Sequence, residues 1–228
     1  MISVIIPILE EEKRIRTLID YLNSVETRKA FEIIVVDGGG NSSVLNQLPA
    51  TARYIQSEKG RAIQMNAGAR IAMGDLLYFV HADALPPPSF TEDISKAITG
   101  GFCVGCFRMK LVPESFLTNI NTFFSRFNGR FSGGGDQTLF VTREIFEKEG
   151  GFNEDFCIME DFEFVRRLKP KYGFHVIQKD VQVSARKYQA NNYWKVNLAN
   201  YKAFRMFENK VNPALIKETY YSWIKRGE

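Results

Sequence analysis

The run Phe79-Val80-His81-Ala82-Asp83 places an imidazole and a carboxylate at the end of the apolar segment 76–80. An apolar segment of this length predicts a buried strand, so His81 and Asp83 stand at its C-terminal tip. In an open parallel α/β sheet, ligands bind at the carboxyl ends of the strands. We therefore expect the chemistry to gather at that edge, where His81 and Asp83 supply part of a shell for a divalent cation.

A second apolar segment, 31–36, ends in the same way, in Asp37-Gly38-Gly39-Gly40. Asp37 and Asp83 should then project into one crevice. Each motif also has a plainer interpretation. Asp37 before three glycines is compatible with a tight turn, because Asp bonds its own backbone and Gly accepts positive φ. His81 and Asp83 are also compatible with an ordinary surface pair.

Strand and helix patterns alternate along the chain. We expect strands at 2–7, 31–36, 53–56, 76–80, 102–110, within 138–148, and at 174–184. We expect helices at 12–22, 61–72, 90–98, within 138–148, from 160 onward, and over 191–225. Near-continuous apolar strands separated by helices predict an α/β fold with a mostly parallel sheet covered on both faces. Residues 132–137 are expected to form a flexible loop.

Composition limits the class of protein. With 228 residues and 45% hydrophobic content, the chain can bury one sizeable core. We expect a cytoplasmic protein, because no apolar window is long enough to span a membrane and no signal-peptide pattern is present. Three cysteines fit a reducing compartment, and Cys103 and Cys106 are interpreted as structural thiols rather than a redox or metal pair. The net charge of +4 is spread out and predicts no nucleic-acid partner.

Two charged clusters follow later in the chain. Glu160-Asp161 opens an expected helix, where acids are favoured by the helix dipole. Their place after the glycine loop also suits a general base that takes a proton from an incoming hydroxyl. Arg186-Lys187 is a cation pair that would hold a leaving diphosphate, or else a solvated face.

The order of these motifs resembles the nucleotide-binding half of a family 2 glycosyltransferase with the GT-A fold. The matching motifs are Ser3 to Pro7, Val35 to Gly39, Gly60-Arg61-Ala62, Asn66 to Ala69, Gly74-Asp75 and His81 to Asp83, then Leu139 to Arg143, Gly150 to Phe152, Glu160-Asp161 and Arg166 to Leu168. The resemblance covers residues 1–190, which we expect to form the glycosyltransferase domain, with 191–228 a helical extension packed on it.

The resemblance implies a role for each matched residue. Asp161 corresponds to the base that deprotonates the acceptor hydroxyl, with Glu160 beside it, and direct displacement would invert the anomeric carbon. Asp83 corresponds to the last acid of an Asp-x-Asp motif that binds Mg²⁺ or Mn²⁺. The remaining expected donor contacts are Pro7, Glu11, Asp37, Arg61, His81, Arg186 and Lys187. Asp136 and Gln137 are expected to contact the acceptor.

Three residues depart from the family pattern. His81 stands where the first acid of Asp-x-Asp is usual, Glu10 where Asn is common, and Ser42 where an acid is common. Imidazole is an acceptable ligand for Mn²⁺, and the second acid remains. The segments 135–137 and 184–187 also resemble a bacterial subgroup described as arsenosugar-biosynthesis glycosyltransferases.

Two functions from different classes are compatible with these residues. The leading hypothesis is an inverting, metal-dependent glycosyltransferase that uses a nucleotide sugar and either a small-molecule or a lipid-linked acceptor. The alternative is a non-catalytic nucleotide-sugar-binding or scaffold protein, although Glu160-Asp161 would be superfluous in one. A nucleotidyltransferase would need a glycine-rich basic loop after the first strand, where this chain has Glu10-Glu11-Glu12.

An aromatic stripe at helical spacing runs through the middle of the chain. Its members are Phe116, Ile120, Phe123, Phe124 and Phe127. The spacing suits an interfacial helix at a membrane, but it also suits burial in the core or in a homodimer interface. We favour burial. The aromatic residues of 191–225 leave a dimer contact and a lid over the acceptor equally open.

Overall fold

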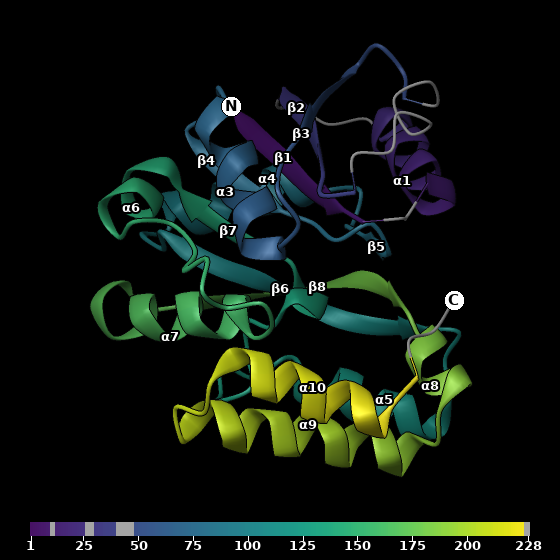
Figure 1. The fold of residues 1–228 in the computed structure, drawn as a ribbon. Coiled ribbons are helices and arrows are strands. Elements are labelled where there is room, and N and C mark those ends of the chain that lie inside the picture. The colour runs from purple at the N-terminus through teal and green to yellow at the C-terminus, as the bar shows by residue number, and fades with distance from the viewer. Residues whose placement is uncertain (10–11, 26–29, 40–47, 226–228) are drawn as a thin grey trace.

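The strand β1 (Ile2–Ile8) lies inside the sheet, and each of its residues is buried. Most of them are β-branched and apolar, which suits a strand covered on both faces. It pairs in parallel with β2 (Phe31–Asp37) on one side and with β4 (Leu76–Phe79) on the other. The computed structural model describes residues 1–9, 12–25, 30–39 and 48–225 (Figure 1).

Among the described residues, the sheet has eight strands in the order β3-β2-β1-β4-β7-β6-β8-β5. The other strands are β3 (Ala52–Gln56), β5 (Ala84–Leu85), β6 (Val104–Val112), β7 (Leu139–Thr142) and β8 (His175–Ser184). Only β7 and β5 run against the common direction, because β4–β7, β6–β7 and β5–β8 pair antiparallel while β6–β8 is parallel. The prediction of a mostly parallel α/β sheet is confirmed.

Helices cover both faces of the sheet, and the sheet separates the hydrophobic core into two parts. Alternate residues of β1 point to opposite faces, so Val4 and Ile6 join one core while Ile5 joins the other. The first core contains residues of α1 (Glu12–Ser24) and α4 (Phe90–Thr99). The second contains residues of α3 (Arg61–Ile71), α6 (Arg143–Lys148) and α7 (Glu160–Tyr172).

Two local predictions need correction. The strand β4 ends at Phe79, and a two-residue strand, β5, follows Asp83 and pairs with β8 near its end, a pairing between distant residues that no local pattern signals. The segment 132–137 is not loop throughout. It contains a 3₁₀ turn, η1 (Gly135–Gln137), and the buried Gln137 side chain accepts a hydrogen bond from the backbone of Gly133 at 2.8 Å.

The thiols at the start of β6 are free. Cys106 is buried, and burial raises its pKa to about 12. A thiol held in its protonated form is a poor nucleophile and a poor metal ligand. In the part of the chain that the structure describes, no three His, Cys, Asp or Glu side chains are grouped to hold a metal ion. The raised pKa of Cys106 agrees with the interpretation of that cysteine as a structural residue.

The C-terminal segment forms α8 (Arg186–Ala190), α9 (Tyr193–Glu208) and α10 (Pro213–Trp223). In Figure 1, α9 and α10 lie side by side beneath the sheet, close to α7. Buried residues of α9 and α10 pack against Phe156 and Phe162, which flank the start of α7. Within the described ranges, no helix is long and apolar enough to cross a membrane.

The aromatic stripe lies on α5 (Phe116–Phe124) and just beyond it. Burial in the core was the wrong prediction, because all five of its apolar side chains are exposed in this chain. Helical periodicity distinguishes two faces of a helix, but it does not say which face meets the protein.

Candidate active site

The parallel strands β1, β2 and β4 end at one edge of the sheet, and Asp37 closes β2 there. Its carboxylate is buried and accepts hydrogen bonds from the Gly39 N–H at 2.7 Å and from the Tyr54 hydroxyl at 2.9 Å. The first of these bonds is the turn interaction that the sequence left open. Asp37 therefore shapes the end of β2, and its contact with a nucleotide stays a prediction.

His81 lies beside Asp161, although the two residues are far apart in sequence. The His81 Nε2 atom is 4.0 Å from Asp161 Oδ2, and both side chains are buried. Gly135, in η1, lies against both. A Cβ at Gly135 would be 2.5 Å from His81 Cε1 and 2.7 Å from Asp161 Oδ2. His81, Asp161 and Gly135 thus come from three separate segments that meet here, and a side chain at position 135 would clash with the other two.

Asp161 is held in place by the first turn of α7. The residue before that helix, Met159, has a left-handed φ of 66°, which is uncommon outside glycine and asparagine. Glu160 is also buried, and its Oε1 atom lies 3.7 Å from Arg61 Nη1. No hydrogen-bond donor among the described residues reaches that oxygen. The Arg61 side chain itself is largely exposed at the start of α3.

Electrostatics give His81 and Asp161 different protonation behaviour. Burial raises the pKa of the Asp161 carboxyl well above its usual range, and the neighbouring Glu160 carboxylate raises it further, while Arg61 opposes both. Burial, with a smaller contribution from Arg61, lowers the pKa of His81 to about 3. His81 is therefore a neutral imidazole at pH 7, and the Asp161 carboxyl holds a proton more readily than an ordinary aspartate does.

The two predicted cations each face a predicted acid. Arg186 Nη2 lies 3.4 Å from Asp83 Oδ2, and Lys187 Nζ lies 3.9 Å from Asp136 Oδ2. Lys187 is the largest cause of the lowered pKa of Asp136. The β5–β8 pairing accounts for the first contact, because it brings Asp83 next to Ser184, whose N–H donates to the Asp83 carbonyl at 3.2 Å.

Two predicted donor contacts remain untested by this geometry. Pro7 is buried within β1 opposite Val36, one residue before the strand ends. Glu11 lies outside the described residues, as do Glu10 and Ser42.

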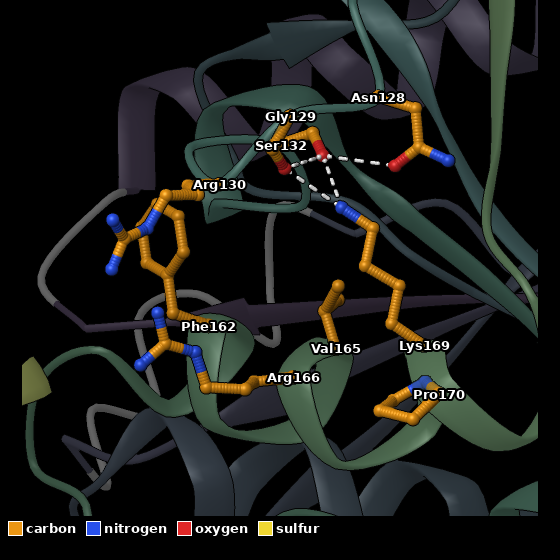
Figure 2. A pocket seen from close by; sticks show the side chains of 9 residues that line it. All are labelled: Asn128, Gly129, Arg130, Ser132, Phe162, Val165, Arg166, Lys169 and Pro170. Atoms are coloured by element: carbon orange, nitrogen blue, oxygen red, sulfur yellow. Dashed lines mark hydrogen bonds between the residues drawn. The ribbon is translucent and has the colours of Figure 1, made fainter.

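A pocket of about 430 Å³ opens on the side of α7 (Figure 2), but it is not the predicted site. It is lined by Asn128, Gly129, Arg130, Ser132, Phe162, Val165, Arg166, Lys169 and Pro170. Its cations are engaged by the protein. Lys169 Nζ donates to Ser132 Oγ at 2.9 Å, and both Arg130 and Arg166 pair with Glu208. None of the predicted site residues lines this pocket.

The model of glycosyl transferase family 2 matches residues 3–155, more than half of the chain. The chain belongs to this family. A glycosyltransferase of Haemophilus influenzae is 25% identical over 190 residues, covering 76% of this chain and 64% of its own. A second relative, from Methanococcus voltae, is named dolichyl N-acetyl-alpha-D-glucosaminyl phosphate 3-beta-D-2,3-diacetamido-2,3-dideoxy-beta-D-glucuronosyltransferase. It is 25% identical over 201 residues, covering 76% of this chain and 62% of its own.

The fold agrees with that of a solved mannosyltransferase structure. The mannosyltransferase PcManGT from Pyrobaculum calidifontis, in complex with GDP-Man and Mn²⁺, superposes with a TM-score of 0.67 at 17% identity. The match covers 97% of this chain and 68% of that one. The predicted GT-A fold is therefore confirmed. The chain spans less than two thirds of the length of the two relatives described above.

For this family 2 chain, the predicted ligands Asp83 and His81 are of residue types that can hold a divalent ion. Asp83 offers a carboxylate and His81 a neutral imidazole, and both ligand types suit Mn²⁺. An ion in such a site takes one or two protein carboxylates together with substrate phosphates, rather than a complete protein cage.

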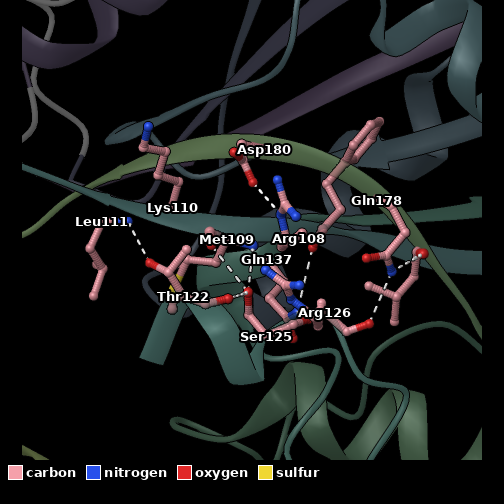
Figure 3. Close-up of polar contacts among 12 residues, drawn as sticks. Arg108, Met109, Lys110, Leu111, Thr122, Ser125, Arg126, Gln137, Gln178 and Asp180 are labelled. Atoms are coloured by element: carbon pink, nitrogen blue, oxygen red, sulfur yellow. Dashed lines mark hydrogen bonds and ion pairs between the residues drawn. The ribbon is translucent and has the colours of Figure 1, made fainter. Parts of the chain in front are cut away.

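The side chain of Gln137 hydrogen-bonds to the protein backbone. Its amide donates to the Ser125 carbonyl at 2.8 Å (Figure 3). Its Oε1 accepts from the Gly133 N–H, so both ends of the buried side chain are used. Gln137 thus fixes the segment that carries Gly135, and the acceptor contact predicted for it stays a prediction. Asp136, by contrast, is half-exposed beside Lys187.

Sequence reasoning missed two parts of this family 2 site. Gly135 was seen only as part of a loop, although its missing side chain lets His81 and Asp161 approach each other. Tyr220 comes from α10 and hydrogen-bonds Lys187, and its hydroxyl donates to Asn200 at 2.9 Å. The aromatic residues of the C-terminal segment were the available signal, but their periodicity does not identify which one faces a lysine.

Proposed function

We propose that this protein transfers a sugar from a nucleotide-diphospho-sugar to an acceptor hydroxyl, with inversion at the anomeric carbon and Asp161 as general base. The observation that carries the proposal is a buried carboxylate of raised pKa beside a neutral imidazole, at the edge where the parallel strands end. Membership of glycosyl transferase family 2 supports the same reaction class.

The proposed step is a direct displacement. Asp161 accepts the proton of the acceptor hydroxyl while that oxygen forms a bond to the anomeric carbon. The bond from that carbon to the diphosphate oxygen breaks, and the diphosphate leaves with both electrons. Because the new bond forms on the face opposite the leaving group, the configuration inverts. The products are a glycoside, a nucleoside diphosphate and a proton, first held by Asp161.

Charged residues at the strand ends would hold the donor. Arg186 and Lys187 suit a diphosphate, since each is already placed against a carboxylate that a phosphate can replace. Asp83 and His81 would hold Mg²⁺ or Mn²⁺, which neutralises charge on the leaving diphosphate when bound. Arg61, exposed beside Glu160, remains the proposed contact to the base or phosphates of the nucleotide.

Asp136 is the residue proposed to contact the acceptor. It is half-exposed and paired with Lys187. The name of the Methanococcus voltae relative describes transfer to a dolichyl-linked sugar phosphate. That name supports a lipid-linked acceptor here, with a small molecule as the other class. The narrower resemblance to arsenosugar-biosynthesis enzymes stays a prediction.

Calorimetric titration tests the donor site. UDP, GDP and dTDP are titrated with and without Mn²⁺ into the wild type, Asp83→Ala and the control Asp75→Ala, whose exposed carboxylate lies by the N-terminus. We expect one nucleotide to bind more tightly with Mn²⁺ and Asp83→Ala to lose about tenfold in that affinity, or about 1.4 kcal/mol. Asp75→Ala should match the wild type.

Two other results would contradict the proposal. If no nucleotide binds under either condition, the metal-dependent donor site is wrong. If a nucleotide sugar binds but is neither transferred nor hydrolysed, the non-catalytic binding protein is the better description.

The pH dependence of turnover tests the base through its neighbours. Asp161 works when deprotonated, so activity should fall as the pH drops through its raised pKa. Glu160→Gln removes the negative charge that raises this pKa, and should move the acid limb of kcat/KM to lower pH. Arg61→Gln removes the positive charge that lowers it, and should move the limb to higher pH.

Nucleotide release from the nucleotide sugar, with each profile scaled to its own plateau, measures both shifts. A purely structural role for these residues would lower the plateau and leave both limbs in place. Shifts in the same direction for the two variants would contradict the assignment of Asp161.

A further inference from the structure

The helix α5 presents its polar side to the protein. Thr122 Oγ1 accepts from the Leu111 N–H at 3.4 Å, and Ser125 Oγ, just past the helix, both accepts from and donates to the backbone of Met109 at 3.1 Å (Figure 3). Thr118 is the one buried residue of the helix. These bonds fix the rotation of α5 against β6 and leave its other side facing outward.

The outward side of α5 is aromatic. Phe116 is 84% exposed and Phe124 is 62% exposed, and Ile120, Phe123 and Phe127 are exposed with them. The spacing 116, 120, 123 and 127 places four of these residues in one row along the helix direction. A surface helix normally buries its apolar row against its own core. In α5 the usual arrangement is reversed.

The neighbouring helix α9 carries a second exposed apolar row. Trp194, Leu198 and Tyr201 are exposed at helical spacing. The helices lie side by side because Asn121 of α5 donates to Asn197 Oδ1 at 3.2 Å and accepts from the Tyr193 hydroxyl at 3.0 Å. We call these eight residues the aromatic face: Phe116, Ile120, Phe123, Phe124, Phe127, Trp194, Leu198 and Tyr201. Large exposed apolar surfaces mark protein or membrane contacts.

Positive charge accompanies the aromatic face. Residues 113–131 and 191–225 together carry eight Lys or Arg and three Glu, whereas the net charge of the whole chain is only +4. Lys195, Lys202 and Arg205 are exposed on α9, and the Arg126 guanidinium lies 4.4 Å from the centre of the Phe123 ring. The cationic excess of the protein is therefore concentrated in the segments that carry the aromatic face.

We propose that the aromatic face seats the protein on an anionic membrane surface, with its rings in the interfacial layer and its cations near the lipid headgroups. Aromatic and basic residues on one helical surface are the combination that such binding requires. A two-fold dimer through the same face would set the cationic excess of each copy against that of the other. Charge therefore favours the membrane over a second copy.

The aromatic face adjoins the proposed acceptor side. Asn121, between the two helices, donates to the Tyr188 hydroxyl at 2.8 Å, and Tyr188 lies next to Lys187 in sequence and against its ammonium group. Membrane seating does not depend on glycosyl transfer. If the proposed function holds, membrane binding through the aromatic face would bring a membrane-borne acceptor close to Lys187 and Asp136.

Vesicle flotation tests whether the aromatic face binds an anionic membrane. The wild type, Phe116→Ser/Phe124→Ser and the control Met73→Ser are floated with phosphatidylcholine vesicles, with or without phosphatidylglycerol, at low and high salt. Met73 is 65% exposed and lies before β4, away from the aromatic face. We expect the wild type to bind the anionic vesicles, and the double variant to bind at least about tenfold less, because two exposed rings no longer insert. Met73→Ser should bind as the wild type does, and high salt should weaken binding.

Failure of the wild type to float with anionic vesicles overturns the proposal, as does equal flotation of the double variant. Self-association of the wild type that the double variant loses, without vesicle binding, would assign the face to a second copy. Nucleotide titration of the same proteins keeps the two proposals apart. The double variant should bind the nucleotide normally, and a wild type that floats without binding any nucleotide would contradict only the proposed function.

Discussion

Replacement of Asp161 by Asn is expected to lower kcat by about 10³-fold while the affinity for the donor nucleotide is retained. Asn has nearly the same shape and keeps the packing beside His81 and Gly135. It has no basic oxygen with which to take the acceptor proton. The loss should therefore fall on kcat, because a proton-transfer contact stabilises only the transition state.

The measurement is release of nucleoside diphosphate from the nucleotide sugar, alongside calorimetric binding of the nucleotide. Glu160→Gln is the matched control, since it changes the adjacent buried carboxylate in the same way. We expect a smaller loss there. Unchanged kcat in Asp161→Asn would remove Asp161 as the base, and a larger loss in Glu160→Gln would transfer the role to Glu160.

The sequence was sufficient to predict that residues of the candidate site would meet at one edge of the sheet. Strands β2 and β4 end where apolar runs meet Asp37 and His81, and parallel strands bring such ends together. The acids of α7 were predicted from their position at a helix start, and the structure places Asp161 against His81. These features depend on local pattern and strand direction, which a single sequence contains.

Contacts between distant segments were not predictable in this way. The pairing of Arg186 with Asp83 depends on β5, a strand of two residues that has no periodicity to detect. Tyr220 reaches Lys187 only because α10 folds back over the site. For neither pair does the separation of the two residues in the sequence indicate that they are in contact.

The orientation of α5 is a second limit of pattern reasoning. The apolar row from Phe116 to Phe127 has the same period whether it is buried or exposed. Polar residues decided the outcome, because Thr122 and Ser125 find backbone partners on β6 and turn the aromatic row outward. That β6 offers these backbone partners can be seen only in the three-dimensional fold.

Replacement of Gly135 by Ala is expected to lower kcat by about 10²-fold, since a misplacement of about 1 Å in an active site costs that much. The added methyl group would lie 2.5 Å from His81 Cε1 and 2.7 Å from Asp161 Oδ2, so at least one of the two side chains must move. Both contacts are to side-chain ends rather than backbone. We therefore expect the thermal unfolding temperature to change little.

Gly129→Ala is the matched control, because its Cβ would meet nothing within 4 Å. Turnover, Mn²⁺-dependent nucleotide affinity and thermal unfolding are measured on both variants. Loss of turnover in Gly135→Ala alone, with unfolding unchanged, would mean that the space between His81 and Asp161 is required for the reaction. Full turnover in Gly135→Ala would mean that the acceptor hydroxyl approaches Asp161 from another side. The narrow gap at Gly135 would then be a packing feature of η1 rather than part of the catalytic geometry.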